Sequence, residues 1–433
     1  MIAPQHSKDP APRGNGSSGG GACSSGCGCG SGASSTGSKE APANLATLVE
    51  KAEELARDWR LDAVRAWKAR TKGIAVGYLP VWAPRELLHA MGVLPVGVMG
   101  AGDDLEIIRG DAYYQSYICH LPRSVIELGL NGALDCLDGM LFPATCDVIR
   151  NLSGVWKLSF RGKLSFYLDV PQDFERELGG QFLRQTLLEL AHELETRGAR
   201  KLDMGALARS IRLFDENRAL VRQLYTLRRD EPWRVLTSEL YPVLRAGLVQ
   251  PVEEHNELLA AYLDLVRSAT ERRPLDQARV VVSGSFCEQP PLSLLKTLER
   301  GGCSIVDDDF VQITRWITSD VDQPHNTGKD ALDWLVNSFL SDSTDSPVRY
   351  CAKGRKGDDL VRRVRASRAE GVLLCAPSFC DPALLDQPML QDALDAAKIP
   401  WTNFKYAENT GQFQVIREQA GTFADSIKLW SEA

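Results

Sequence analysis

The sequence lacks a long apolar run, an excess of basic residues and a phosphate-binding loop, and each absence excludes a class of protein. No stretch approaches the roughly 18 consecutive apolar residues that span a bilayer, so we expect no membrane partner. Lysine and arginine number 50 against 57 aspartate and glutamate. This balance leaves no basic excess to neutralise a nucleic-acid backbone, so nucleic acid is not expected as a partner either. The pattern G-x-x-x-x-G-K-[ST] is absent, which argues against a P-loop for ATP.

Length and composition are otherwise typical of a globular protein. At about 150 residues per domain, 433 residues predict two or three domains, and a hydrophobic share of 44% can form more than one core. The first residues lack the charged and apolar segments of a secretory signal, so we expect a cytoplasmic protein. Eleven cysteines then stand out. In a reducing compartment, thiols are more often buried, metal-bound or reactive than paired as disulfides.

Composition and periodicity predict five regions. Residues 1–42 are expected to form a disordered tail rich in Gly, Ser and Cys, 43–70 an N-terminal helix, 71–172 a first α/β domain, 173–275 a helical connector and 276–433 a second α/β domain. In both α/β regions, short buried strands alternate with amphipathic helices, which is typical of parallel sheets covered by helices. We therefore predict an α/β fold with two doubly wound, flavodoxin-like or Rossmann-like domains.

Two cysteines occupy equivalent positions in the two α/β regions. Cys146 and Cys380 each follow a buried strand and a short loop, and each precedes an aspartate and a predicted helix. Ligands bind at this edge of parallel sheets, and a helix N-terminus favours the thiolate that binds iron or zinc. Cys119 lies in an aromatic stretch, where a helix is expected over 114–128. Together with Cys146 and Cys380, it gives three thiols that could converge on one site. Because no compact metal motif is present, buried apolar cysteines are the alternative interpretation.

The other cysteines have more ordinary interpretations, with one exception. Cys287 follows a strand much as Cys380 does, and its position alone does not exclude it from the same site. The three thiols of the tail have the spacing C-x3-C-x-C and could bind a metal, but ordering such a flexible segment costs conformational entropy. Incidental thiols are favoured for the remainder: Cys23, Cys27 and Cys29 in the tail, Cys136, Cys303 and Cys375 in core elements, and Cys351 in a basic loop.

Several long stretches of the sequence resemble those of a known protein family. They comprise residues 78–96, the surroundings of Cys119, 142–156 (FPATCDVIRNLSGVW), 376–390 (APSFCDPALLDQPML) and 408–423 (ENTGQFQVIREQAGTF). These stretches resemble the benzoyl-CoA reductase and 2-hydroxyacyl-CoA dehydratase family, and the resemblance covers roughly residues 70–433. The Gly/Ser/Cys tail falls outside it and inherits no role.

The resemblance implies a [4Fe-4S] cluster with three cysteine ligands, and the matching positions are Cys119, Cys146 and Cys380. Cys287 matches no ligand position and stays a neighbouring or core residue. Three thiolates on four irons leave one iron open to water, a side chain or a substrate oxygen. The implied activity is reductive dearomatisation of benzoyl-CoA to a cyclic dienoyl-CoA by one-electron steps through a ketyl-like radical. Dehydration of a 2-hydroxyacyl-CoA by related chemistry and a non-catalytic two-lobed binding protein are the alternatives.

The family arrangement also implies partners. Two related cluster-bearing catalytic subunits hold the acyl-CoA and dock to two ATPase, or activator, subunits, and a low-potential donor such as ferredoxin supplies the electrons. ATP is therefore expected on partner subunits only, and this chain is expected to be one of the catalytic pair. The subunit that binds the substrate, the fourth ligand of the cluster and the proton donor stay open.

Three groups of polar residues have two interpretations each. His120 is either a proton donor or a structural histidine, and the second is favoured. Asp307–Asp309 are either metal ligands or a solvated strand end, and again the second is favoured. A row of arginines either binds the CoA phosphates or forms a solvated helix face, which is favoured. These arginines are Arg362, Arg363, Arg365 and Arg368.

Overall fold

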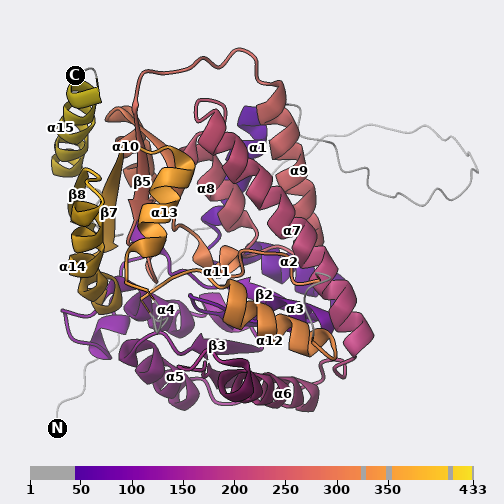
Figure 1. Ribbon diagram of the computed structural model, residues 1–433. Helices are drawn as coiled ribbons and strands as arrows, with labels where there is room; N and C mark the ends of the chain where they lie inside the picture. The colour runs from indigo at the N-terminus through magenta and orange to yellow at the C-terminus, as the bar shows by residue number, and fades with distance from the viewer. Residues whose placement is uncertain (1–43, 323–327, 348–353, 408–412, 432–433) are drawn as a thin grey trace, which may run out of the picture. The chain divides into compact units, whose positions relative to one another are not determined.

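Two parallel β-sheets organise the part of the chain that the computed structural model describes, which is residues 44–322, 328–347, 354–407 and 413–431. Within these residues, the first sheet has the strand order β2-β1-β3-β4 and the second has β6-β5-β7-β8, with parallel neighbours throughout (Figure 1). The predicted α/β class is therefore confirmed. The strands are β1 (Ile74–Tyr78), β2 (Val93–Gly97), β3 (Gly139–Pro143), β4 (Leu164–Leu168), β5 (Ala278–Ser283), β6 (Cys303–Asp308), β7 (Gly371–Pro377) and β8 (Trp401–Tyr406).

Strand composition follows from position in the sheet. The inner strands β3 and β7 are buried along their whole length and are almost entirely apolar, and the outer strand β2 is equally buried. Helices cover parallel sheets on both faces, so inner strands have no polar face. The outer strand β8 is only partly buried and carries polar side chains such as Thr402 and Lys405. The two sheets thus repeat one pattern, in which β1, β2, β3 and β4 correspond to β5, β6, β7 and β8.

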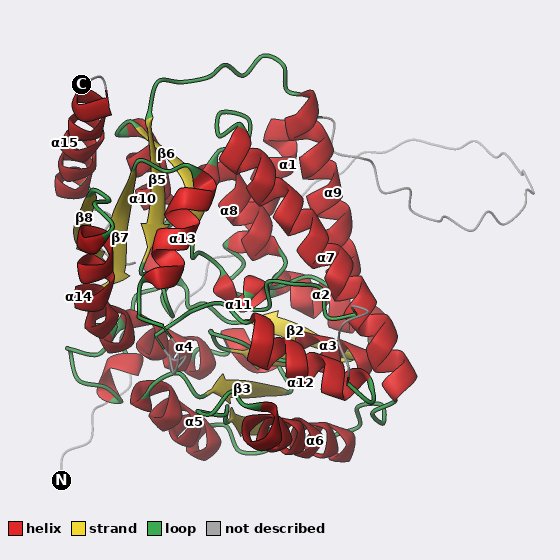
Figure 2. Ribbon diagram, viewed as in Figure 1, coloured by secondary structure: helices red, strands yellow, loops and turns green. Residues whose placement is uncertain are grey.

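Helices surround both sheets and fill the segment between them (Figure 2). They are α1 (Leu45–Ala56), α2 (Asp62–Thr71), α3 (Arg85–Ala90), α4 (His120–Leu130), α5 (Asp147–Ser159), α6 (Gln181–Thr196), α7 (Met204–Asp230), α8 (Thr237–Ala246), α9 (Val252–Ser268), α10 (Leu292–Arg300), α11 (Gln312–Arg315), α12 (Ala331–Asp342), α13 (Asp358–Ser367), α14 (Asp381–Ala396) and α15 (Gln414–Ser431). Short helical turns are η1 (Gly102–Asp104), η2 (Gly110–Ala112), η3 (Ala133–Cys136) and η4 (Arg176–Gly180). None of the helices that the structure describes is long and apolar enough to cross a membrane.

Two helix boundaries differ from the sequence-based expectation. The segment expected as one helix over 43–70 contains two, α1 and α2, because Leu61 adopts a left-handed conformation between them. The helix expected over 114–128 begins only at His120, with Cys119 as its N-cap. The second difference bears on the site, because it places Cys119 at the end of a helix rather than inside one.

The connecting helices tie the two sheets together. Helix α7 contacts α3 beside the first sheet and β6 of the second. Arg218 of α7 pairs with Glu86 of α3 at 2.6 Å, and Arg228 near its other end pairs with Asp308 of β6 at 2.6 Å. The chain from residue 41 onward forms one compact unit. The finer division at residues 172 and 275 stays a prediction.

Candidate functional site

The three cysteines singled out by the sequence are the N-cap residues of three helices. Cys119 precedes α4, Cys146 precedes α5 and Cys380 precedes α14. Cys146 is the third residue after β3, and Cys380 is the third residue after β7, the equivalent strand of the other sheet. Cys119 and Cys380 are buried and Cys146 is partly buried. The positive end of a helix dipole therefore lies at each thiol, which favours a bound anion such as thiolate.

The thiols lie close enough to influence one another. Burial raises the pKa of Cys119, and the neighbouring Cys380 and Cys146 raise it further. Burial also raises the pKa of Cys146, against a lowering by the N–H groups of Ile149 and Val148, although the sulfur does not cap α5 at full hydrogen-bond geometry. Uncharged thiols are therefore favoured at Cys119 and Cys146 without a bound cation. A metal centre reverses this balance, because it binds the deprotonated sulfur.

Cys287 joins this group. It is 4% exposed and lies in the loop after β5, the strand that pairs with β7. Its thiol interacts with the Cys380 sulfur, and this interaction lowers the pKa of Cys380 in spite of burial. The pKa of Cys287 itself is raised, first by the same interaction and then by burial, with the neighbouring Cys146 and Cys119 also contributing. Four thiols from both sheets therefore face one region.

Two hydroxyl groups beside the thiols support a bound group in this region. Tyr114 Oη is buried without a hydrogen-bond partner among the described residues. Burial raises the pKa of Tyr114, and the neighbouring Cys119 and Cys146 raise it further. Thr145 Oγ1, next to Cys146, is also buried, and its interaction with the Cys146 sulfur favours the deprotonated form and so lowers the pKa of that thiol. Because buried donors normally have acceptors, these hydroxyls fit a sulfur-rich group held by the cysteines.

The loop after β5 also connects the site across the two sheets. The carboxylate of Glu288, which is 1% exposed, accepts the backbone N–H of His120 at 3.1 Å. A negative charge at the N-terminus of α4 is favourable for the helix dipole. The imidazole of His120 is buried, and burial lowers the pKa of His120 to about 4. A histidine whose imidazole is uncharged at neutral pH fits the structural interpretation better than that of a proton donor.

The described residues contain no group of three or more His, Cys, Asp or Glu side chains that could hold a metal ion. The thiols therefore do not converge as the ligands of a single ion do. A four-iron cluster requires a different arrangement of its ligands, because each cysteine binds its own iron atom and the cysteine sulfurs stay apart. The tail cysteines Cys23, Cys27 and Cys29 and the loop residue Cys351 lie outside the described residues.

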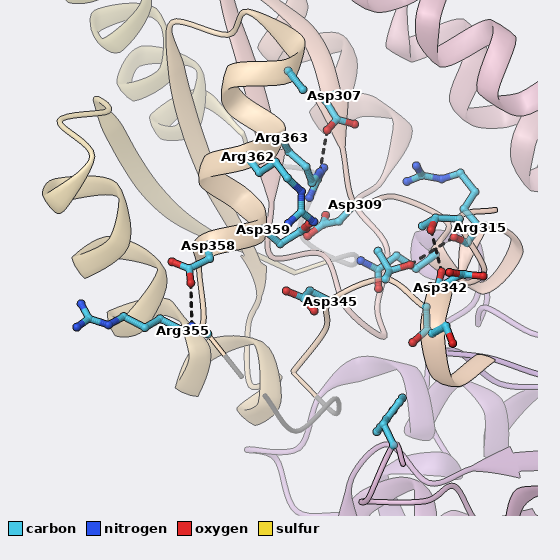
Figure 3. Close-up of a pocket in the computed structure, with 18 of the residues that line it drawn as sticks. Asp307, Asp309, Arg315, Asp342, Asp345, Arg355, Asp358, Asp359, Arg362 and Arg363 are labelled. Carbon is cyan, nitrogen blue, oxygen red and sulfur yellow. Dashed lines mark hydrogen bonds and ion pairs between the residues drawn. The ribbon is translucent and has the colours of Figure 1, made fainter. Parts of the chain in front are cut away.

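A cavity of about 1440 Å³ opens at the carboxyl end of β6, beside α13 (Figure 3). Within the described chain, nine acidic and four arginine side chains line it, so its charge disfavours the phosphates of CoA. Figure 3 shows Arg363 directed at Asp307, which it pairs with at 2.8 Å. Arg362 pairs with Asp359. Arg362 and Arg365 lie on the exposed side of α13 and Arg368 is exposed just after its end, as expected, whereas Arg363 is mostly buried.

The expectation of a solvated strand end at Asp307–Asp309 is wrong for two of the three residues. Asp308 is 2% exposed and pairs with Arg228 at 2.6 Å and with Arg315 at 3.0 Å. Asp309 is also buried, and it accepts hydrogen bonds from the loop after β5. The run of three aspartates suggested that their side chains are solvated. Asp308 and Asp309 are buried because their partners come from segments that are distant in the sequence.

Comparison with known proteins identifies the family. Residues 80–427 match the family described as 2-hydroxyglutaryl-CoA dehydratase, D-component. The chain belongs to this family. The family resemblance inferred from these stretches of the sequence is thus confirmed, and the match includes every strand except β1 and all four thiols.

Relatives of known function divide into two groups. The chain is 50% identical to a subunit of the benzoyl-CoA reductase of Thauera aromatica, over 89% of this chain and 99% of that protein. It is 29% identical to the beta subunit of (R)-2-hydroxyglutaryl-CoA dehydratase of Acidaminococcus fermentans, over 83% of this chain and 94% of the relative. It is 28% identical to the beta subunit of lactoyl-CoA dehydratase of Anaerotignum propionicum, over 84% and 95% of the two chains.

Proposed function

We propose that this chain is an iron–sulfur catalytic subunit of an ATP-dependent benzoyl-CoA reductase, an oxidoreductase. The observation that carries the proposal is the 50% identity to a benzoyl-CoA reductase subunit along nearly the whole of that protein, against 25–29% for the dehydratase subunits. The reaction adds two electrons and two protons to the aromatic ring of benzoyl-CoA and yields a cyclic dienoyl-CoA. The thioester carbonyl assists by accepting negative charge on oxygen.

Cys119, Cys146 and Cys380 are the proposed ligands of a [4Fe-4S] cluster. Their support is geometric: each thiol begins a helix, and each pair of them interacts electrostatically. When bound, such a cluster supplies one-electron transfer at low potential. The helix N-termini stabilise the negative charge of the three thiolates. Burial of Cys119 and Cys380 keeps water from the sulfurs, which strengthens every electrostatic interaction there.

The proposed assembly follows the names of the relatives, which are all subunits of larger enzymes. This chain would pair with a related cluster-bearing subunit and with two ATPase subunits, and a donor such as ferredoxin would supply electrons. ATP would bind to those partners. We also propose a cytoplasmic location, which suits oxygen-sensitive chemistry in a reducing compartment.

Iron analysis tests the ligand proposal. The chain is purified anaerobically with its partner subunits, and iron and acid-labile sulfide are measured for the unaltered protein, Cys146→Ser, Cys380→Ser and Cys303→Ser. We expect the first two variants to lose most of the iron assigned to this chain. Cys303→Ser, at a buried thiol away from the site, should retain it. Equal iron in all four proteins would contradict the proposal and favour a non-catalytic binding protein.

Substrate trials distinguish the dehydratase alternative, which the family description favours. The complete complex receives ATP and a low-potential reductant together with either benzoyl-CoA or a 2-hydroxyacyl-CoA. Consumption of benzoyl-CoA with formation of the dienoyl-CoA is expected. Dehydration of the hydroxyacyl-CoA without consumption of benzoyl-CoA would overturn the proposal. An anaerobic structure with bound acyl-CoA then shows whether this chain or its partner touches the thioester.

A further inference from the structure

The cavity at the carboxyl end of β6 holds more negative charge than its own arginines balance. Nine acidic and four arginine residues line it within the described chain. Three of the arginines are already paired with aspartates of the same cavity, namely Arg315 with Asp308, Arg362 with Asp359 and Arg363 with Asp307. The fourth is Arg355, and Figure 3 shows its side chain directed away from Asp345. An excess of carboxylates therefore faces the cavity.

Two of these carboxylates are exposed and form no ion pair with any described residue. They belong to Asp345, which follows α12, and to Asp358, in the first turn of α13. The excess of acid also acts on Asp359. Burial raises the pKa of its carboxyl group, and the negative charges of Asp345 and Asp307 raise this pKa further, although two arginines oppose the shift. A cation that enters the cavity would relieve this repulsion.

A buried side chain of the same cavity lacks a hydrogen-bond partner. Gln312 of α11 is 6% exposed and lines the cavity, yet its Oε1 accepts no hydrogen bond from the described residues. Arg363 Nη2 is also buried, and it donates to no described residue. Buried polar atoms of folded proteins nearly always have partners. An occupant of the cavity that supplies both a donor and an acceptor would satisfy both atoms.

Size and chemistry restrict what that occupant is. The volume of about 1440 Å³ exceeds the roughly 300–1,000 Å³ that is typical of small-molecule sites. Within the described residues, the carboxylates do not group in threes as the ligands of a metal ion would. The excess of acid disfavours an anion. A polypeptide segment that carries lysine or arginine fits, because its side chains supply cations and its backbone supplies both N–H donors and carbonyl acceptors.

We propose that this cavity is a docking site for a basic segment of a partner subunit. The lysine or arginine side chains of that segment pair with Asp345 and Asp358, and its backbone bonds to Gln312 and Arg363. This role rests on the proposed function, because it requires the assembly of this chain with other subunits. It concerns that assembly and not the four thiols, which lie outside the lining of the cavity.

Fluorescence anisotropy with a labelled peptide, Gly-Lys-Gly-Arg-Gly-Lys-Gly, tests the docking site. The full chain purified anaerobically without its partners is compared with the assembled complex, and a peptide with glutamine at the three basic positions is the uncharged control. The variants are Asp345→Asn/Asp358→Asn, Gln312→Leu and a matched control, Asp62→Asn/Asp425→Asn. The matched control removes the same charge at exposed positions of α2 and α15, and Asp62, like Asp358, lies in the first turn of its helix.

We expect the unaltered chain to bind the basic peptide, more weakly as salt is added, and not the uncharged one. Asp345→Asn/Asp358→Asn should weaken binding about tenfold, because two exposed ion pairs are lost. Gln312→Leu should weaken binding about fivefold through the loss of one hydrogen bond. The matched control should stay within about twofold of the unaltered chain, because its charges are distant from the cavity and screened. The assembled complex should not take up the peptide, because the segment of the partner already occupies the cavity.

Three results would overturn the inference. They are a lack of peptide binding by the isolated chain, equal weakening by the matched control and by Asp345→Asn/Asp358→Asn, and equal peptide binding by the assembled complex and the isolated chain. Spermidine is added as a competitor, and if it binds the assembled complex with the same dependence on Asp345 and Asp358, the cavity is a polyamine site instead. If Gln312→Leu does not fold, the aspartate variants decide alone. A chain that copurifies with no partner contradicts the proposed function itself, which is a different result.

Discussion

Asp309 shows how the surroundings of a single residue change its chemistry. Burial raises the pKa of its carboxyl group to about 6, although Arg363 and the N–H of Gly284 both oppose the shift. Because the folded-state pKa lies above the ordinary value of 3.8, the folded protein binds more protons than the unfolded chain between about pH 4 and 6. This carboxyl therefore makes folding less favourable as pH rises through that range, and the effect is complete above pH 6.

Replacement of Asp309 by asparagine should remove this pH dependence. Asparagine keeps an acceptor for Ser283 and Gly284 but cannot ionise. From pH 4 to pH 7 the unaltered protein should lose about 2–3 kcal/mol of unfolding free energy relative to Asp309→Asn. Urea unfolding of both proteins at several pH values measures this difference. Parallel pH profiles for the two proteins would show that Asp309 is charged in the folded state across the range.

Asp308 presents the opposite case, since Arg228 and Arg315 hold the pKa of its buried carboxyl below the ordinary value against the effect of burial. Asp308→Ala leaves Arg228 buried without its charge partner, so we expect a loss of about 3–5 kcal/mol in unfolding free energy. Asp230→Ala removes an exposed partner of Arg368 and should cost at most about 1 kcal/mol. Urea unfolding compares the two variants, and equal losses would contradict the importance of burial.

At the scale of elements, the alternation of strands and helices was sufficient to predict both sheets. It works because inner parallel strands are apolar along their length and helices are amphipathic, and both signals are local. The start of α4 was missed because the aromatic residues before Cys119 resemble a helix face. The equivalence of Cys146 and Cys380 was visible in the sequence, since each follows its strand by the same short loop.

The neighbours of Cys380 could not be predicted in the same way. The contact with Cys287 depends on the pairing of β5 with β7, and these strands are separated by several helices and another strand. The burial of Asp308 depends on Arg228 in the connector. Both are contacts between distant segments, which periodicity within one window does not report.

The turn at Gly284 offers a test of how tightly the loop after β5 is held. Gly284 has φ +113°, and a Cβ there would lie 3.0 Å from the carbonyl oxygen of Cys375. Gly162 has φ +92°, but a Cβ there would meet no atom within 4 Å. Both Gly→Ala variants carry backbone strain of about 1–3 kcal/mol, and only Gly284→Ala adds a clash with backbone. Gly284→Ala should therefore lower the unfolding free energy more, as measured in urea.

A second measurement on the two glycine variants concerns the candidate cluster site. Gly284→Ala displaces the loop that carries Cys287, so iron should be lost faster from this variant than from Gly162→Ala when an iron chelator is added. Equal rates of iron loss would indicate that the loop does not support the cluster.

At the scale of the whole molecule, Glu288 joins the segment of α4 to the second sheet by a buried hydrogen bond. Glu288→Ala removes the acceptor of the His120 N–H, so this amide should exchange its hydrogen with solvent faster. Glu288→Gln keeps an oxygen acceptor and should change the rate less. Hydrogen exchange followed by mass spectrometry on peptides that include His120 measures both variants. Unchanged exchange in Glu288→Ala would show that the contact does not hold the two parts together.

The distribution of the proposed ligands along the chain also has a consequence for biosynthesis. Cys119 and Cys146 leave the ribosome early, whereas Cys380 follows Cys146 by 234 residues and belongs to the other sheet. A nascent chain therefore lacks the third thiol until most of the polypeptide has been made and β7 has paired with β5. Delivery of the proposed cluster would then come only after most of the chain has been made, and the newly made protein would first have to keep its closely spaced thiols reduced.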